Sequence, residues 1–516
     1  PLIDLLAPDG WSGNGRSSDA GHILIGRLDD PAQQAQHDAT LNLSAEGSVL
    51  VFGTNRSGKS ALLRTIAVSA GRNALAEPVH VYGIDFTGRG LASLEVLPHV
   101  GSVIAGEDEE RVARLVRYLR EVQRDRATLF RDANNAADLD EYRRAVPETD
   151  LARIIVLIDG YPSFNTTYEL TMDDLPEQLA RLVSEGSSAG IHFVLGADLR
   201  TGVPTKVYGG ISSRVVLRMA TDDEYTNVDL PHGALSSEAP AGRGYLNDSE
   251  VQVALVGSGT SGEEQVEALQ RVAEELSYLP AAPPIERLES ELALSSLPRA
   301  TAPGTAVVGR SGITLEPVAV NLVDQHTVVL GPGGSGRTSA LLTMATGCPD
   351  GTWSQRIVLS PRPSFLTAAP DTWTAVGESL SSCTDVLTEL IERIEAIAEG
   401  EAEPLEPTLL VIDDLFEMTG DFSLEEGLGT VLTLTRDHPI RIVVSCDLDH
   451  AKRSSVDFFQ EIRSARHGIL LHPEMGDGDF LGAQFRIPSV AAQPTGRGYF
   501  IVRGQPELIQ LADPLA

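Results

Sequence analysis

The sequence predicts an α/β protein made of two tandem copies of one domain, each a mostly parallel sheet flanked by helices. Two observations lead to this prediction: short apolar runs alternate with helical patterns, and four motifs occur twice in the same order. Continuous apolar runs such as VLVFG, VHVYGID, IIVLID and HFVLGA are typical of strands covered on both faces. Between them, EERVARLVRYLREVQRDRATLF has the spacing of an amphipathic helix.

The repeat relates the two halves of the chain. LNLSAEGSVLVFGTNRSGKSALLRTIA, from Leu41, reads like VNLVDQHTVVLGPGGSGRTSALLTMATG, from Val320. Three further pairs follow in the same order: IIVLIDG with LLVIDD, HFVLGADL with RIVVSCDL, and PAGRGYL with PTGRGYF. Because self-similarity in a fixed order marks a duplicated structural unit, we expect the same fold twice.

The boundary between the copies is expected in the proline-rich stretch from Leu279 to Gly304, near residue 290. Such a composition is typical of an interdomain linker. We therefore predict a first domain over 1–280, a linker over 281–304 and a second domain over 305–516. The opening PLIDLLAPDGWSGNGR reads like the tail of a similar linker, which indicates a further domain upstream.

Composition weighs against several classes of function. The chain has 73 acidic and 40 basic residues, a net charge of −33, and no Lys/Arg-rich run, which argues against nucleic acid as the working substrate. No apolar run approaches the ~20 residues that span a bilayer. The three cysteines lie far apart without metal-binding spacing, which favours a reducing compartment.

The first copy contains a complete nucleotide-binding motif between a strand and a helix. The residues that fit G-x-x-x-x-G-K-[ST] are Gly53, Thr54, Asn55, Arg56, Ser57, Gly58, Lys59 and Ser60. Glycines let backbone N–H groups surround phosphate oxygens, and the following helix contributes its dipole. We expect Lys59 to reach the β- and γ-phosphates of ATP and Ser60 to ligate Mg²⁺. The predicted fold is thus a RecA-like P-loop NTPase.

An acidic residue ends the strand ARIIVLID at the position of a Walker B aspartate. Asp159 is expected to hold Mg²⁺ through water and is the candidate catalytic residue, with a buried structural aspartate as the alternative. The next residue in an active motor is usually a glutamate that polarises the attacking water, but here it is Gly160. Binding of ATP is therefore predicted, and fast hydrolysis is not.

Other polar residues lie near the predicted sheet edge. Asp85 ends one strand and Asp198 follows another, and each either caps the strand end or assists catalysis. His192, at a strand start, is expected to be a packed histidine. Four arginines are candidates for phosphate contacts, with a structural role as the alternative: Arg200, Arg214, Arg218 and Arg243.

The second copy has a degenerate loop. It keeps Gly331, Gly336 and Thr338 but has Arg337 in place of the lysine. A planar guanidinium and a compact ammonium are not interchangeable, so Arg337 either fills the phosphate pocket or misplaces the γ-phosphate. Asp413 is the matching Mg²⁺-site aspartate, followed by Asp414. We predict no ATP turnover here; the site either binds nucleotide weakly or serves as a docking groove.

Several stretches of the first copy resemble the FtsK/SpoIIIE family, and more closely the EccC/EssC ATPases of type VII secretion. They include GRLDDPAQQAQ, VYGIDFTGRGLASLEVLPHVGSVIAGEDEERVARLVRYL, VLIDGYPSF, AGIHFVLGADLR and ISSRVVLRMATDDE. In the second copy, RSARHGILLHPEMGDGDFLGAQFR and PTGRGYF are similar to the terminal domain of EssC-type proteins. The resemblance covers nearly the whole chain.

The resemblance implies the second and third ATPase domains of such a protein, on the cytoplasmic side of a bacterial plasma membrane. It implies an upstream motor domain, membrane-embedded secretion components, and WXG100-type substrates whose C-terminal signal docks on the second domain here. A homo-hexamer is compatible with the full protein. The predicted function couples substrate recognition to protein export with slow or regulatory hydrolysis. The alternatives are an FtsK-like DNA translocase and a non-hydrolysing nucleotide-binding scaffold.

Overall fold

The computed structural model describes residues 21–30, 34–74, 77–88, 90–169, 174–369, 371–453, 457–485 and 493–516. The linker tail predicted at the N-terminus lies outside the described residues, as do residues 31–33 of GRLDDPAQQAQ and the last residue of the motif that ends at position 486. No helix within the described ranges is both long enough and apolar enough to cross a lipid bilayer.

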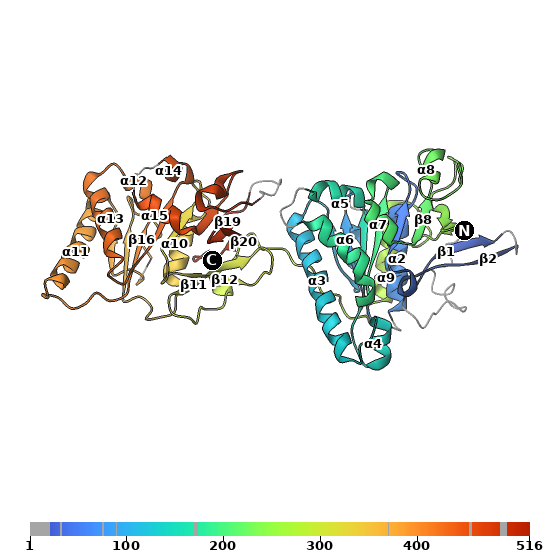
Figure 1. Ribbon diagram of the computed structural model, residues 1–516, viewed down its shortest axis with the longest axis horizontal. Coiled ribbons are helices and arrows are strands. Elements are labelled where there is room, and N and C mark those ends of the chain that lie inside the picture. Colours follow the sequence, from blue (N-terminus) through green and yellow to red (C-terminus); the bar gives the residue numbers. More distant parts are fainter. Residues whose placement is uncertain are drawn as a thin grey trace. The chain divides into compact units, whose positions relative to one another are not determined.

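The chain divides into two compact units, Pro1–Glu286 and Arg287–Ala516. Each unit is built on a ten-stranded sheet flanked by helices (Figure 1).

The strands of the first unit are β1 (His22–Asp30), β2 (Ala35–Asn42), β3 (Val49–Phe52), β4 (Val79–Asp85), β5 (Val100–Ala105), β6 (Arg153–Asp159), β7 (Ile191–Ala197), β8 (Ser213–Leu217), β9 (Arg243–Leu246) and β10 (Ser249–Val253). Its helices are α1 (Leu43–Glu46), α2 (Lys59–Asn73), α3 (Glu109–Asp132), α4 (Leu139–Ala145), α5 (Tyr161–Tyr168), α6 (Leu175–Glu185), α7 (Thr205–Gly210), α8 (Asp222–Thr226) and α9 (Gly262–Glu275).

The strands of the second unit are β11 (Thr305–Ser311), β12 (Pro317–Asn321), β13 (Thr327–Leu330), β14 (Gln355–Leu359), β15 (Ala375–Gly377), β16 (Thr408–Ile412), β17 (Ile440–Cys446), β18 (His467–Leu471), β19 (Arg497–Val502) and β20 (Gln505–Leu511). Its helices are α10 (Arg337–Thr346), α11 (Leu380–Ala398), α12 (Leu415–Met418), α13 (Phe422–Leu434), α14 (Leu448–Arg453) and α15 (Asp457–Ala465).

The two sheets have the same strand order, which confirms the predicted duplication. The orders are β2-β1-β10-β9-β8-β3-β7-β6-β4-β5 and β12-β11-β20-β19-β18-β13-β17-β16-β14-β15, so each strand has a counterpart at the same place. In the first sheet the strands from β8 to β5 run parallel, as predicted, and the rest extend the sheet with antiparallel pairing. The second sheet repeats this division.

Helices on both faces of the sheet explain the continuous apolar runs. Every residue of β6 is buried. Its side chains alternate between faces, so Ile155 and Leu157 join a core with α2 and α9, while Ile154 and Val156 join a core with α3 and α6. Because β3, β7, β6 and β4 are parallel neighbours in this packed sheet, their carboxyl ends lie at one edge, where polar side chains can meet.

The proline-rich stretch binds along each unit in turn. On the first unit, Tyr82 donates a hydrogen bond to the carbonyl of Pro283 at 2.9 Å, and Ile285 is buried in the core. On the second, Arg497 donates to the carbonyl of Glu289 at 3.2 Å, and Leu292 is buried. The prolines thus belong to an extended segment that forms few helical hydrogen bonds of its own. This segment packs against the units and is not a fully solvated linker.

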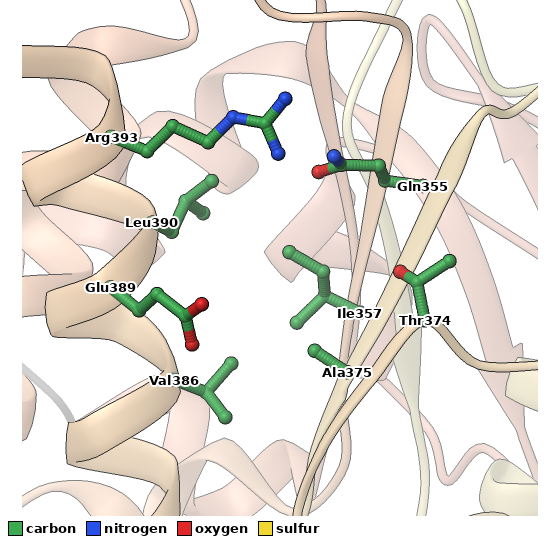
Figure 2. A pocket seen from close by; sticks show the side chains of 8 residues that line it. All are labelled: Gln355, Ile357, Thr374, Ala375, Val386, Glu389, Leu390 and Arg393. Carbon is green, nitrogen blue, oxygen red and sulfur yellow. The ribbon is translucent and has the colours of Figure 1, made fainter. Parts of the chain in front are cut away.

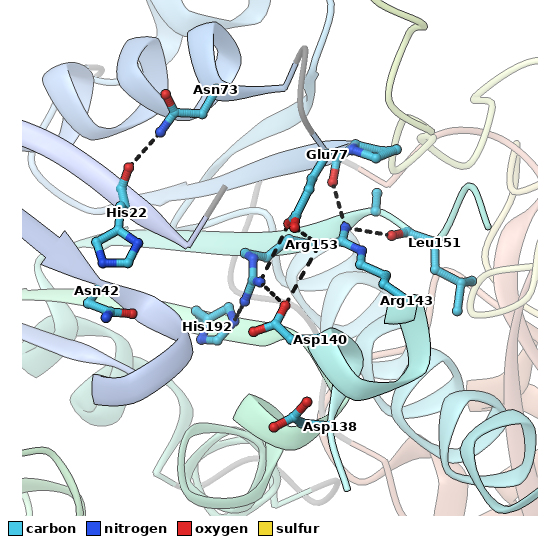
Figure 3. A network of polar contacts seen from close by, with 12 residues as sticks. His22, Asn42, Asn73, Glu77, Asp138, Asp140, Arg143, Leu151, Arg153 and His192 are labelled. Atoms are coloured by element: carbon cyan, nitrogen blue, oxygen red, sulfur yellow. Dashed lines mark hydrogen bonds and ion pairs between the residues drawn. The ribbon is translucent and has the colours of Figure 1, made fainter. Parts of the chain in front are cut away.

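A buried polar network ties α4 to the amino-terminal end of β6, far along the strand from Asp159. Figure 3 shows Arg153 between His192 and Asp140. The Arg153 guanidinium donates to the Asp140 carboxylate at 2.6 Å and to Nε2 of His192 at 2.9 Å, and it is 1% exposed. Nδ1 of His192 donates to the carbonyl of Gly47 at 2.8 Å. Although burial opposes its ionisation, the Arg153 charge lowers the pKa of Asp140.

His192 is held neutral, which makes stability depend on pH. Burial, with Arg153 nearby, lowers the pKa of His192 to about 3, whereas an unfolded histidine titrates near pH ~6.5. Between these values the unfolded chain binds a proton that the folded chain does not. The free energy of unfolding therefore falls as pH falls from ~6.5 towards 3, by up to about 1.4 kcal/mol per pH unit, and is unaffected by this group above pH ~6.5.

We expect His192→Gln to flatten that dependence, because an amide has both a donor and an acceptor but does not titrate. The measurement is urea unfolding of both proteins, followed by circular dichroism at several pH values between 4 and 7. Parallel pH profiles for the two proteins would show that His192 does not carry the effect.

Candidate functional site

The predicted nucleotide-binding loop of the first unit joins β3 to α2. Gly58 has φ 109°, and a Cβ there would lie 2.8 Å from the backbone nitrogen of Gly242. That nitrogen donates a hydrogen bond to the carbonyl of Ser57 at 2.8 Å. Any larger residue at position 58 would be both strained and crowded. The GRGY motif therefore packs on the loop, a contact that sequence reasoning missed because the two motifs lie far apart in the chain.

The loop lysine folds back over its own loop. Lys59 is 8% exposed, and its Nζ donates to the carbonyl of Gly53 at 2.6 Å and to that of Thr54 at 3.2 Å. It also forms an ion pair with Oδ1 of Asp198 at 2.7 Å. The Asp198 side chain is 72% exposed, so this pair is open to solvent on one side. The ammonium is thus positioned at the mouth of the loop with an exchangeable anionic partner.

Ser60 and Asp159 are brought together at the carboxyl ends of the strands. The Ser60 hydroxyl donates to Oδ2 of Asp159 at 2.5 Å, and Thr87 donates to the same oxygen at 3.0 Å. Asp159 is fully buried, and burial raises its pKa despite these two hydrogen bonds. Thr87 was not singled out from the sequence; its place two residues after β4, whose last residue pairs with Asp159 in the sheet, is the signal that would have found it.

These residues suit a phosphate and a hard cation. Within the described residues, Oδ1 of Asp159 and the hydroxyl of Ser57 are buried without a hydrogen-bond partner. A carboxylate oxygen beside two hydroxyls is a donor set that Mg²⁺ prefers, usually completed by water. A glycine-lined loop with a lysine at its mouth suits the phosphates. The residues present thus fit a nucleotide with Mg²⁺.

The backbone conformation of the residue after Asp159 explains why a glutamate is absent there. Gly160 has φ 92°, in the left-handed region, and a Cβ there would lie 3.0 Å from Cβ of Phe86. Its counterpart Asp414 has φ 50°, also left-handed. Glycine and aspartate tolerate this conformation better than glutamate does. The backbone in both units is therefore adapted to the residue that each copy has.

The remaining candidates have structural partners. Asp85 accepts backbone N–H bonds from Thr87 and Leu91, both at 2.8 Å, so it caps the loop after β4. Asp198, by contrast, faces Lys59.

The four arginines all have partners within the first unit. Arg200 and Arg214 contact the Tyr208 ring, with guanidinium carbons 3.7 and 4.1 Å from its centroid. Arg218 donates to the carbonyl of Ala239 at 3.0 Å, and Arg243 pairs with Glu250 at 2.6 Å. These contacts favour the structural alternative for their side chains.

The second loop has the same backbone but different side-chain pairing. Gly336 has φ 102°, and the Gly496 nitrogen donates to the carbonyl of Ser335 at 2.9 Å, as in the first unit. The loop runs from Gly331 through Thr338, and the Thr338 hydroxyl lies 3.2 Å from Oδ2 of Asp413. Burial raises the pKa of Asp413, which also accepts a 2.6 Å hydrogen bond from Ser445.

Arg337 pairs with the acid that replaces Gly160. Its Nη2 donates to Oδ1 of Asp414 at 2.8 Å, and Arg362 donates to Oδ2 of the same carboxylate at 2.8 Å. The first loop has no such pair, because glycine has no side chain.

The second unit also has a cavity of about 150 Å³ between α11 and the neighbouring strands β14 and β15 (Figure 2). Val386 and Leu390 of α11 face Ile357 of β14, and Glu389 and Arg393 of the same helix also line the cavity. None of its lining residues belongs to either P loop. The cavity is therefore distinct from the predicted second nucleotide site.

Comparison with known proteins identifies relatives for both units. Residues 26–247 match the model of the FtsK/SpoIIIE family. The chain is 27% identical to the ESX secretion system protein EccC of Thermomonospora curvata, over 98% of this chain and 40% of that protein. It is 24% identical to the ESX-1 secretion system protein EccCb1 of Mycobacterium tuberculosis, over 99% of this chain and 91% of that protein.

The fold is similar to a solved structure along nearly its whole length. The structure of ATPases 2 and 3 of Thermomonospora curvata EccC, in complex with a signal sequence peptide, superposes with a TM-score of 0.76 at 25% identity. The match covers 98% of this chain and 94% of that one. This agreement confirms the predicted fold of two tandem RecA-like P-loop domains, each a mostly parallel sheet flanked by helices.

Proposed function

Because residues 26–247 form an FtsK/SpoIIIE-family domain and the whole chain is similar to EccC, we propose that it is the ATP-binding module of a type VII secretion ATPase. In this role it couples recognition of a secretion substrate to protein export. The observation that carries the proposal is the agreement between fold and site: the intact loop, Ser60 and Asp159 meet at one sheet edge in a fold shared with the EccC ATPase domains. The chain spans 40% of the length of the Thermomonospora protein, so the activity and partners of the full-length protein belong to the proposal.

ATP binds at the first loop. Its backbone N–H groups and Lys59 hold the phosphates, and Ser60 and Asp159 hold Mg²⁺, in line with the general use of nucleotide and magnesium in this family. Magnesium, when bound, neutralises charge on the phosphate oxygens. Gly160 provides no carboxylate to polarise water, so hydrolysis is slow and serves regulation.

The second unit recruits the substrate. Its degenerate loop is unsuited to turnover, and the related EccC structure contains a signal sequence peptide. The partner we propose is a WXG100-type protein whose C-terminal signal binds the second unit. The chain would then work beside an upstream motor domain and membrane-embedded components on the cytoplasmic side of the bacterial plasma membrane, with a homo-hexamer as the assembly of the full protein.

The test is ATP turnover and ATP affinity of the purified chain, with and without a peptide of the C-terminal signal of a WXG100-type substrate. Turnover below about 1 s⁻¹, slower than most enzymes, is expected. The peptide is expected to change the ATP affinity by about 5-fold or more, as a coupling free energy of about 1–3 kcal/mol between two sites gives. A scrambled peptide is the control. Tight ATP binding without turnover or peptide response would favour a scaffold, and salt-dependent binding of duplex DNA would favour a translocase.

A further inference from the structure

The cationic side chains of the two P loops form ion pairs with different aspartates of the same chain. In the first unit the Lys59 ammonium pairs with Asp198, a side chain that is 72% exposed. In the second unit the Arg337 guanidinium pairs with Asp414, a side chain that is only 16% exposed. Asp414 occupies the position of Gly160, directly after the predicted Mg²⁺-site aspartate. The second loop therefore faces a half-buried carboxylate, whereas the matching residue beside the first loop is a glycine with no side chain.

A second arginine holds the Asp414 carboxylate in place. Arg362 donates to Oδ2 at 2.8 Å while Arg337 donates to Oδ1 at 2.8 Å, so both oxygens are engaged. Glu417 in turn pairs with Arg362 at 2.5 Å. The backbone N–H of Asp414 donates to the Ser445 hydroxyl at 2.9 Å. Charge-assisted hydrogen bonds on two sides restrict the carboxylate to one orientation.

The loop itself keeps the features of an anion site. Gly331 and Gly336 have φ values of 159° and 102°, close to the 159° and 109° of Gly53 and Gly58 in the first loop. Gly496 packs on Ser335 as Gly242 packs on Ser57. Within the described residues, Nη1 of Arg337 and the hydroxyl of Ser335 are buried without a partner, and Ser335 is fully buried. The backbone is thus preserved, and the difference lies in the acid that faces the loop cation.

We propose that Asp414 takes the place of a phosphate by pairing with Arg337, the phosphate-binding cation of the second P loop. The loop therefore excludes nucleoside triphosphates until Asp414 is removed or displaced. The proposal rests on the proposed function of the first loop as the ATP site. Asp414 acts in two ways: it neutralises Arg337, and its own charge repels a phosphate next to Asp413. A half-buried ion pair between oriented groups is a far stronger competitor than the exposed Asp198, because solvent screens the latter.

The experiment titrates variants of the full chain with a fluorescent ATP analogue and Mg²⁺. It measures the dissociation constant and the number of analogues bound per chain. Lys59→Ala removes the first site, so binding in that background reports the second. Asp414→Gly copies the residue of the first unit and suits the left-handed backbone, and Asp414→Asn removes only the charge. Glu417→Gln is the matched control, because it alters the same cluster without contacting Arg337. Melting temperature verifies that each variant is folded.

Lys59→Ala combined with Asp414→Gly is expected to bind one analogue per chain, at least about 10-fold more tightly than Lys59→Ala alone. Asp414→Asn is expected to give a smaller gain, and Glu417→Gln none. Adding Arg337→Lys to the glycine variant gives the second site the lysine and the glycine of the first site and is expected to tighten binding further. If folded Asp414 variants gain no binding while the unmodified chain binds one analogue through Lys59, the inference is wrong and the proposed function stands. If the unmodified chain binds none, the proposed function fails. Two analogues per unmodified chain would overturn the inference, since Asp414 would then block nothing.

Discussion

Replacing Lys59 by alanine is expected to abolish ATP binding by the chain at the concentrations where the unmodified protein is saturated. Lys59 is the cation whose Nζ lies at the mouth of the intact loop, between the Gly53 carbonyl and Asp198. Removing one partner of a buried charged contact costs about 2–5 kcal/mol, which corresponds to roughly a 30- to 5,000-fold weaker affinity. We therefore expect the dissociation constant to rise by about 100-fold or more.

The chain offers matched controls for this measurement. It has only three lysines, and Lys206 is exposed on α7, so Lys206→Ala should bind ATP as the unmodified protein does. Arg337→Ala should also leave ATP binding unchanged, because Arg337 already pairs with Asp414 and the second loop is not expected to bind ATP. The readout is titration calorimetry with ATP and Mg²⁺. Full binding by Lys59→Ala would place the nucleotide elsewhere, and a loss in Arg337→Ala would show that the second loop is the ATP site.

The parallel part of each sheet was predictable from sequence, and the antiparallel part was not. Strands such as β6 and β7 are buried along their whole length, so their apolar runs are long and continuous. In contrast, β9 and β10 are short and alternate between buried and less buried residues. Such short alternating segments carry little signal without their partners. GRGYL was recognised as a repeated motif, but its role as a strand next to β8 depends on tertiary pairing.

The candidate site was predictable where one local motif specifies both conformation and chemistry. The P loop is of this kind, and so is the aspartate at the end of an apolar strand. Contacts between distant segments are different: Thr87 on Asp159, Asp198 on Lys59 and Asp414 on Arg337 all come from separate strand ends. Their residue types are common at strand ends, so only the packed sheet shows which of them meet.

A substitution in the buried network at the amino-terminal end of β6 is expected to have the largest effect on stability. Arg153 begins the strand that ends in Asp159, and its guanidinium connects that strand to α4 through Asp140 and to β7 through His192. Arg153→Ala would leave Nε2 of the buried His192 without its donor and Asp140 without its main countercharge. Breaking a buried ion pair by removing one partner typically costs about 3–5 kcal/mol. We expect a loss of this size for the first unit.

Comparison with an exposed arginine on α4, the helix that Arg153 contacts through Asp140, separates this effect from a general loss of charge. Arg144 lies on α4, its side chain is 74% exposed, and it pairs with Glu141 at 3.9 Å, so Arg144→Ala should cost at most about 0.5 kcal/mol. The measurement is urea unfolding followed by circular dichroism, which detects both units. In proteins that also carry Trp11→Phe, which removes the one tryptophan in the sequence of the first unit, fluorescence of Trp353 and Trp373 reports the second unit, whose transition should stay unchanged. Equal shifts for Arg153→Ala and Arg144→Ala would mean that the network holds no more stability than a surface ion pair. A selective loss would show that the strand carrying the Mg²⁺-site aspartate is anchored at its opposite end by this one guanidinium.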